Sequence, residues 1–296
     1  MRSEICRLAI AAALMILPII TAVCQAESAR TIIIFPRINA PVQRIYDTII
    51  EGIQKTLPQS TPLSLDRSLQ PAEVESAIRP FNPDKIIVLG RTTAEKVALS
   101  DYRDKMVVAG VLFEPDEYSG ISLAIDSRRL LQEIKTTLPS IKRVFVVGSP
   151  RQPNIRIYPE SLQGQPLIVP QIHEDPLINS RQLWQLLEQA THNTDAIILP
   201  SHLDRDILYE LVQLAWRKKI ILLSTNLAHL KEGVLMVFYP DNAGMGRQIG
   251  DFATQHSGPG FESLTHIQIA LNPTVAKHLG LKFAPDALKR FKLQVK

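Results

Sequence analysis

The stretch AIILPSHLDRDILYELVQLAWRKKIILL, residues 196–223, decides the fold. It opens on apolar residues typical of a buried strand (196–199) and continues, after a polar turn, into a helical pattern over 204–218. A second apolar run, 220–223, predicts another strand. Strand, helix and strand in this order are typical of a βαβ unit, in which the two strands run parallel and the helix crosses over the sheet.

The same alternation continues in both directions along the chain. Further strands are predicted at residues 31–35, 85–89, 106–111, 143–147, 166–169, 234–238 and 266–271. Further helices are predicted at about 42–57, 71–79, 93–99, 127–138, 180–191, 242–256 and 274–279. The alternation predicts a doubly wound α/β architecture. Because so many strands are generous for one sheet of this kind, we expect two α/β lobes, each with its own parallel sheet.

Local signals mark where several of these helices begin and end. Asp126, Ser201 and Asp241 each precede a helical pattern as candidate N-caps, and Pro71 occupies a first-turn position. The basic residues 217–219 close the helix over 204–218, so we interpret them as a solvated helix end. The proline-containing segment 149–164, SPRQPNIRIYPESLQG, predicts a loop near the middle of the chain.

The sequence GMGRQIG, residues 244–250, superficially suggests a dinucleotide-binding loop. Its spacing differs by one residue from that fingerprint, and it lies inside a helical pattern instead of joining a strand to a helix. We therefore predict that these glycines let the helix over 242–256 pack closely against a neighbouring element.

The N-terminal residues have the order of an export signal. Arg2 and Arg7 flank the start of an apolar run over 8–20, and small and polar residues follow as far as Ala26. The run is shorter than the roughly 20 residues that span a bilayer. We expect residues 1–26 to be a signal peptide cleaved after Ala26, which makes the protein periplasmic. Lipidation at Cys24 stays an alternative, although the preceding residue lacks the small side chain of a lipobox.

Composition and motifs argue against several function classes. The chain carries 33 basic and 29 acidic residues without a basic stripe, so we expect no nucleic-acid partner. It has no Walker A motif, no G-x-S-x-G elbow and no H-E-x-x-H pair. Both cysteines, Cys6 and Cys24, lie in the predicted signal, and the histidines lack ligand spacing. We therefore expect a binding protein with no catalytic residues, no metal and no cofactor.

Polar loops follow several predicted strands, and ligands of open α/β sheets bind beyond the carboxyl ends of strands. At the start of the helix over 93–99, free backbone N–H groups, the hydroxyls of Thr92 and Thr93 and the charge of Arg91 suit a carboxylate. We predict a small carboxylated ligand, in the first place an amino acid, although threonines at such positions are also plain caps. The candidate ligand-binding residues in these loops are Arg37, Asn39, Arg91, Thr92, Thr93, Phe113, Ser149, Ser201, His202 and Asn226.

Several stretches together resemble a known family. The most specific is IQIALNPTVAKHLGL, residues 267–281, followed by Pro285. Similar stretches are GVLMVFYPD at 233–241, GRQ at 246–248, TA at 93–94 and DAIILP at 195–200. On these residues the chain resembles the ABC-transporter substrate-binding protein family that includes tryptophan-type amino-acid binders, a branch of the type I periplasmic-binding fold.

The resemblance implies two lobes that close on a small ligand about a multi-stranded hinge. Carried over by position, residues 30–125 with 240–258 form lobe 1, and residues 126–239 with 264–296 form lobe 2. Thr92 and Thr93 then hold a carboxylate, while Ser201, Asn226 and Asp241 face it from the other side or from the hinge. We expect a monomer.

The sequence departs from the family pattern at two places. Residues 149–164 are too short for the helix that usually follows the first strand of the second lobe. The residues before the glycine–strand pattern at Gly120 are acidic, EPDE at 114–117.

Three functions stay open on the sequence. The first is a periplasmic solute-binding protein that delivers its ligand to a membrane ABC permease. The second is a periplasmic sensory module of the same fold that signals through a membrane sensor protein. The third is an exported hydrolase, because Ser201, His202 and Asp204 are the residue types of a catalytic triad. Near neighbours in sequence do not readily stack as nucleophile, base and orienter, so we place the hydrolase last.

Overall fold

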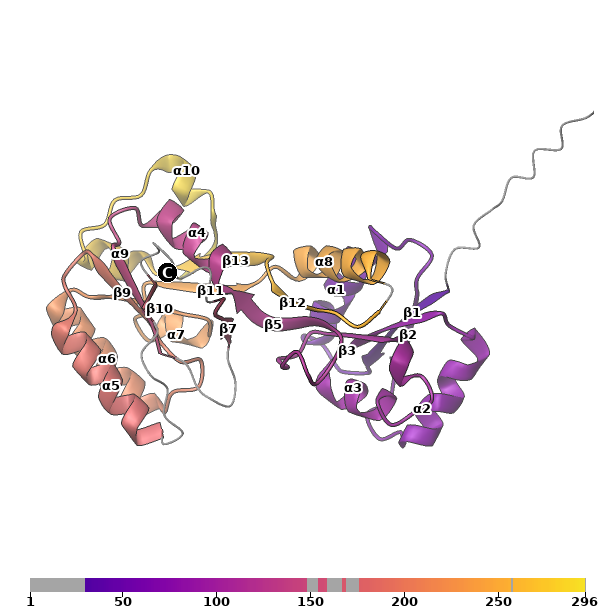
Figure 1. Cartoon of the computed structure of the whole chain (residues 1–296). Coiled ribbons are helices and arrows are strands. Elements are labelled where there is room, and N and C mark those ends of the chain that lie inside the picture. The colour runs from indigo at the N-terminus through magenta and orange to yellow at the C-terminus, as the bar shows by residue number, and fades with distance from the viewer. Residues whose placement is uncertain (1–29, 148–153, 159–166, 169–175, 257, 296) are drawn as a thin grey trace, which may run out of the picture.

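The computed structural model describes residues 30–147, 154–158, 167–168, 176–256 and 258–295. Two lobes, each built on a seven-stranded sheet, are joined by strands that run between them (Figure 1). The predicted pair of α/β lobes with parallel sheets is confirmed. The predicted signal peptide and Ser149 lie outside the described residues and stay predictions.

Lobe 1 contains a sheet in which every pairing is parallel. In spatial order its strands are β12 (Phe261–Leu264), β5 (Gly120–Asp126), β4 (Met106–Ala109), β3 (Lys85–Leu89), β1 (Thr31–Pro36) and β2 (Thr61–Leu65), and β7 (Ile155–Arg156) pairs with β5. All residues of β1 are buried, as expected of a parallel strand covered by helices on both faces.

The helices of lobe 1 lie on the two faces of this sheet (Figure 1). Ile33 of β1 packs in one core cluster with residues of α1 (Gln43–Gln54) and α8 (Asn242–Gln255). Ile32 and Ile34 pack in another with residues of α2 (Pro71–Ile78) and α3 (Arg91–Val97). Successive side chains of a strand point to opposite faces, which explains this division. Short 3₁₀ turns, η1 (Arg79–Phe81) and η2 (Arg103–Lys105), lead into β3 and β4.

Lobe 2 contains the second sheet, which is parallel except for the pairing of β11 with β13. Its strands in spatial order are β14 (Phe291–Gln294), β13 (Ile267–Leu271), β11 (Met236–Pro240), β10 (Ile221–Ser224), β9 (Asp195–Ile198), β6 (Arg143–Val146) and β8 (Leu167–Ile168). Its helices are α4 (Ser127–Thr137), α5 (Pro176–Gln189), α6 (Arg205–Lys218), α7 (Ala228–Lys231), α9 (Pro273–His278) and α10 (Pro285–Leu288).

Among the described residues, the chain crosses between the lobes from β5 into α4, from β11 into α8 and from β12 into β13 (Figure 1). In addition β7, which lies in sequence between β6 and β8 of the second sheet, pairs in the first. The predicted lobe limits fall beside these crossings and stay a prediction. The crossings bring segments far apart in sequence to the junction of the two lobes, and the candidate site lies there.

The N-cap predictions have three different outcomes. The Asp126 carboxylate accepts a hydrogen bond from the Arg128 backbone N–H at 2.8 Å, so this cap is confirmed. Ser201 is not a cap, because a loop follows β9 and α6 begins only after Asp204, which caps it. Asp241 occupies the N-cap position of α8, but its side chain makes no capping hydrogen bond.

The glycines of α8 pack as predicted. A Cβ added to Gly250 would lie 1.8 Å from the Thr56 hydroxyl oxygen, and one added to Gly246 would lie 2.2 Å from the Ile49 carbonyl oxygen. Helix α1 and the segment that follows it therefore lie against the backbone of α8 (Figure 1). Within the described residues, no helix combines the length and apolar character needed to cross a membrane.

Candidate functional site

A cavity of about 540 Å³ lies at the junction of the two lobes. Lobe 1 contributes α1, the end of β4 and the middle of β5, while lobe 2 contributes the loop before α7 and β13. The crossing from β11 to α8 supplies the remaining wall. The lining residues are Val42, Ile45, Tyr46, Thr48, Ile49, Gly110, Leu123, Leu227, Tyr239, Pro240, Asp241, Asn242, Ala243, Met245 and Gln268.

The rim of the cavity is apolar on both sides. Val42 and Ile45 of lobe 1 are 43% and 45% exposed, and Leu227 of lobe 2 is 40% exposed. Large apolar side chains exposed together around a cavity indicate a surface that another group covers. Here a bound ligand or a closing movement of the lobes would cover them.

Polar groups are few and come mainly from the crossing strands. Tyr239 lies directly opposite Gln268 in the antiparallel pair of β11 and β13. Burial raises the pKa of Tyr239, and nearby Asp241 raises it further, so this phenol stays protonated and able to donate. Among the described lining residues, Asp241 carries the only charge. An ionised carboxylate at this position suits a ligand ammonium group.

Tyr46 lines the cavity, and its hydroxyl lies close to Gly90, the residue before α3. Burial raises the pKa of Tyr46, with a smaller opposing effect of Arg67. Its hydroxyl lies 3.1 Å from the point where a Cβ at residue 90 would be, and Gly90 has a φ of +92°. Glycine alone adopts such a backbone without strain, so this residue permits the close approach of Tyr46 to the end of β3.

Arg91, Thr92 and Thr93 are not among the lining residues of the cavity. The Arg91 guanidinium contacts the Glu117 carboxylate at 3.0 Å and donates to the Leu112 carbonyl oxygen. Thr92 is exposed, whereas Thr93 is 6% exposed. Ligand contact by these residues stays a prediction.

Arg37, Asn39 and Phe113 also belong to lobe 1. Arg37 and Asn39 lie in the exposed loop between β1 and α1, where the Arg37 backbone N–H donates to the Leu65 carbonyl at 2.7 Å. Phe113 is buried and packs edge-on against Tyr118, with ring centroids 5.7 Å apart. None of the three lines the cavity, and ligand contact by them also stays a prediction.

In lobe 2 the structure brings Ser201 and Asn226 together. The Asn226 amide donates to the Ser201 carbonyl oxygen at 2.8 Å, and its oxygen accepts from the Ala228 N–H at 3.0 Å. Leu227, next to Asn226, lines the cavity. His202 is exposed nearby. The two loops that carry these residues are thus fixed to each other at the edge of the cavity.

A buried histidine supports these loops. His229 Nδ1 lies 2.8 Å from the Ser224 hydroxyl, and its Nε2 lies 3.4 Å from the Asn226 amide. Burial lowers the pKa of His229, and the charge of His202 lowers it further while Glu232 opposes the shift. Ser224 has no exposed surface, so this serine–histidine contact serves the fold of the loop.

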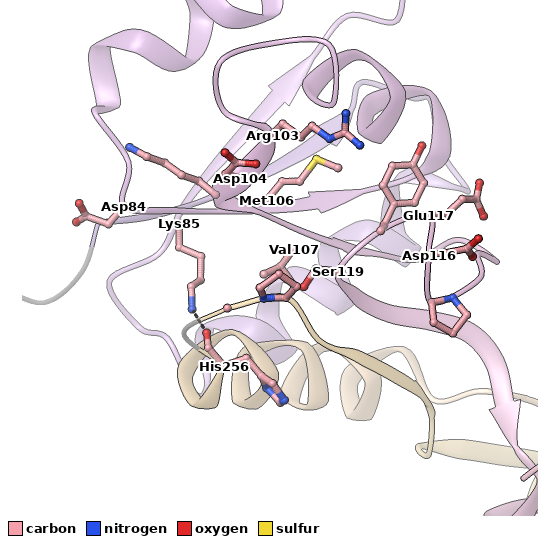
Figure 2. Close-up of a pocket in the computed structure, with 15 residues that line it drawn as sticks. Asp84, Lys85, Arg103, Asp104, Met106, Val107, Asp116, Glu117, Ser119 and His256 are labelled. Atoms are coloured by element: carbon pink, nitrogen blue, oxygen red, sulfur yellow. Dashed lines mark hydrogen bonds between the residues drawn. The ribbon is translucent and has the colours of Figure 1, made fainter.

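A second cavity, of about 570 Å³, lies at the far end of lobe 1. Figure 2 shows charged side chains around it, among them Arg103, Asp104 and Asp116, while the Lys85 ammonium donates to the His256 carbonyl at 2.8 Å. This cavity opens at the amino ends of β3 and β4. Ligands of parallel α/β sheets bind at the carboxyl ends, so the cavity between the lobes is the candidate site.

Sequence reasoning missed most of the lining residues. Leu227 directly follows Asn226, which the sequence singled out. Tyr239 directly follows the strand predicted over 234–238. Tyr46 and Gln268 lie inside a predicted helix and a predicted strand, and nothing in their local patterns separates them from ordinary surface positions. In the part of the chain that the structure describes, no three His, Cys, Asp or Glu side chains gather as metal ligands.

The chain matches no family model and no curated protein. Solved structures similar to it include the ligand-free, open structure of a substrate-binding protein with adhesive properties from Clostridium difficile, with 14% sequence identity over 90% of this chain and 99% of that one, at a TM-score of 0.57. An ABC domain from Streptococcus pneumoniae in complex with L-Trp covers 90% of this chain and 100% of its own, with 16% identity and a TM-score of 0.47. A conserved domain protein from Vibrio cholerae has the same coverage and identity and a TM-score of 0.45.

The similarity to the Clostridium difficile protein and the two parallel sheets define the fold class. The chain has a type I periplasmic-binding-like fold, with two α/β lobes around a junction that holds a cavity.

Proposed function

We propose that the protein is an exported solute-binding protein that closes its lobes on a small carboxylated ligand, an amino acid, and delivers it to a membrane ABC permease. The observation that carries this proposal is the cavity between the lobes, to which both sheets and the crossing segments contribute. A ligand bound there touches both lobes, so its differential affinity favours their closed arrangement.

The character of the cavity favours an amphipathic amine. Asp241 would accept hydrogen bonds from an ammonium group, since it lines the cavity and its side chain makes no helix-capping hydrogen bond. Leu123 and Met245 offer an apolar surface to a side chain. Tyr239 and Gln268 add hydrogen-bonding groups that orient the ligand.

The carboxylate of the ligand is assigned to Thr92 and Thr93 on the sequence pattern. Their position after Gly90, whose backbone lies against Tyr46, makes this assignment compatible with a ligand in the cavity. No Lys, Arg or His is among the described lining residues. In this proposal the threonine hydroxyls and the backbone N–H groups at the start of α3 bind the anion.

Delivery to a permease is proposed on the export signal predicted over 1–26 and the family resemblance of residues 267–281. A binding protein of this kind presents its closed form to the membrane partner, and the apolar rim provides a reason for closure. Val42 and Leu227, exposed on opposite sides of the cavity, would be removed from water when the lobes meet.

The test is to identify what the protein binds. The full chain is expressed in a Gram-negative host, recovered from the periplasm and denatured, and the released small molecules are identified by mass spectrometry. We expect an amino acid or a close relative, which calorimetry with ligand-free refolded protein then confirms. Asp241→Asn is expected to weaken its binding at least tenfold, whereas Asp101→Asn, on an exposed loop of lobe 1, leaves it unchanged. Recovery of no small molecule, together with no heat on adding the common amino acids, would refute the proposal.

A further inference from the structure

A short segment between β6 and β8 of lobe 2 pairs with β5 at the crossings between the lobes, which we term the hinge. Residues 154–158, which we term the strap, belong to the stretch too short for the expected helix, and they run alongside β5. Ile155 and Arg156 pair in parallel with Ile125 and Asp126, and the Ile125 N–H donates to the Asn154 carbonyl at 2.9 Å. The strap therefore adds a strand to the part of β5 that enters lobe 2.

Several contacts tie the strap to lobe 2, among them that of the Arg128 guanidinium of α4, which lies over the Tyr158 ring at 4.3 Å. The Asn154 amide donates to the Ser201 hydroxyl oxygen, in the loop that follows β9. The Tyr158 backbone N–H donates to the Ser127 hydroxyl at 3.4 Å, at the first residue of α4. The strap is therefore linked to the loop after β9 and to the start of α4, both in lobe 2.

Other contacts tie the strap to lobe 1. The Arg156 guanidinium forms an ion pair with the Glu114 carboxylate, in the loop between β4 and β5. The same guanidinium lies over the Phe261 ring at 5.5 Å, and the Tyr158 hydroxyl lies 3.0 Å from the Ser263 hydroxyl. Phe261 and Ser263 belong to β12, which leads into another of the crossings.

The acidic loop extends this contact toward the candidate site. Glu117 accepts a hydrogen bond from the Glu114 N–H at 3.1 Å and contacts Arg91 at 3.0 Å. The loop is thus held between Arg91 at the start of α3 and Arg156 in the strap. The sequence departs from the family pattern in the short stretch 149–164 and in the acidic residues 114–117. The Arg156–Glu114 pair joins these two segments.

We infer that Arg156 and Glu114 are positioning residues that hold the hinge in the arrangement seen here and so set how readily the lobes close. The pair is in contact in this arrangement. Because Asn154 of the same strap contacts Ser201 of lobe 2 while Glu114 belongs to lobe 1, we expect closure of the lobes to separate the pair. A ligand that binds only the closed form has an apparent association constant equal to its intrinsic association constant multiplied by the fraction of molecules that are closed. The inference rests on the proposed function only for this last consequence.

The experiment measures the distance between the lobes without any ligand. The only cysteines lie in the predicted signal, so Arg44→Cys on α1 and Ala228→Cys on α7, both exposed and near the rim, take a pair of spin labels. Double electron–electron resonance then reports the open and closed populations. Arg156→Gln and Glu114→Gln are each expected to raise the population at shorter distances about two- to fivefold, the range for a partly exposed ion pair.

Two controls separate this role from a general loss of stability. The double variant Glu114→Lys with Arg156→Glu restores an ion pair of reversed polarity and is expected to return the populations toward the wild-type values. Lys218→Gln breaks an exposed pair with Glu188 inside lobe 2 and is expected to leave them unchanged. Identical distance distributions in the wild type and both single variants would overturn the inference. Because no ligand is present, that result is independent of whether the protein binds an amino acid.

Discussion

Gly246 of α8 faces Gly52 of α1 so closely that a Cβ added to Gly246 would lie 2.8 Å from the Gly52 Cα. The contact fixes two helices that both contribute to the cavity between the lobes. Tyr46 lies on α1, and Asp241 stands at the start of α8. The packing of α1 against α8 through these glycines therefore sets the position of the Tyr46 ring relative to the Asp241 carboxylate.

Gly246→Ala is predicted to destabilise the protein. The new methyl group would meet the Ile49 carbonyl oxygen at 2.2 Å, and backbone cannot move aside cheaply. Overpacking of this kind costs about 1–3 kcal/mol. Urea unfolding measures the change, with Gly258→Ala as the matched control because nothing lies within 4 Å of a Cβ at that position. Equal midpoints for the two variants would show that α1 and α8 separate easily.

The sequence predicts most of the central strands and helices because their apolar patterns are continuous. β1 and β3 are examples, since helices cover both of their faces and nearly every residue is apolar. β2 and β12 were not predicted as strands, and β5 was indicated only by the glycine–strand pattern at Gly120. Pro62 interrupts the pattern of β2, β5 begins at Gly120 and contains polar residues, and β12 is short and partly exposed. Their pairing is decided by tertiary contacts, which local patterns do not contain.

The candidate site was less predictable than the fold for a related reason. Loops after strands can be located from the sequence, and Asn226, the neighbour of Leu227, was found in this way, whereas Asp241 was singled out by the family resemblance. Tyr46 and Gln268 reach the cavity only because the two lobes meet where they do. The strap is a further case, because a predicted loop supplies the strand β7 at the hinge.

The stability of the protein is predicted to fall as the pH drops below about 6.5. The pKa of His229 is lowered by burial in the folded state, so between the folded and unfolded pKa values the unfolded chain binds the extra proton. This contribution to stability is therefore present above the unfolded pKa and is lost on acidification. Urea midpoints at several pH values between 5 and 8 would measure the loss, and His229→Gln is expected to reduce its slope. A slope unchanged in that variant would point to His266, whose pKa burial also lowers.

Closure of the lobes is predicted to depend on the apolar rim. Leu227 is 40% exposed on lobe 2 and faces a cavity whose other side carries Val42 and Ile45. Leu227→Ser reduces the apolar surface removed from water on closing, so it is expected to weaken binding of the co-purified ligand without altering thermal unfolding.

Small-angle scattering should show a smaller radius of gyration when that ligand binds the wild type. Tight binding with unchanged scattering would place the ligand within one lobe.

The carboxylate assignment makes the sharpest prediction. Thr93→Val keeps the shape of the side chain and removes its hydroxyl, and Thr92→Val does the same one residue earlier. If the hydroxyls bind a ligand carboxylate, each loss costs about 1.5–3 kcal/mol, which is roughly ten- to more than a hundredfold in affinity. Calorimetry with the co-purified ligand measures this, and circular dichroism checks that the fold is intact. Wild-type affinity in both variants would mean that these threonines only form the first turn of α3, and the ligand carboxylate would then have to be bound elsewhere in the cavity.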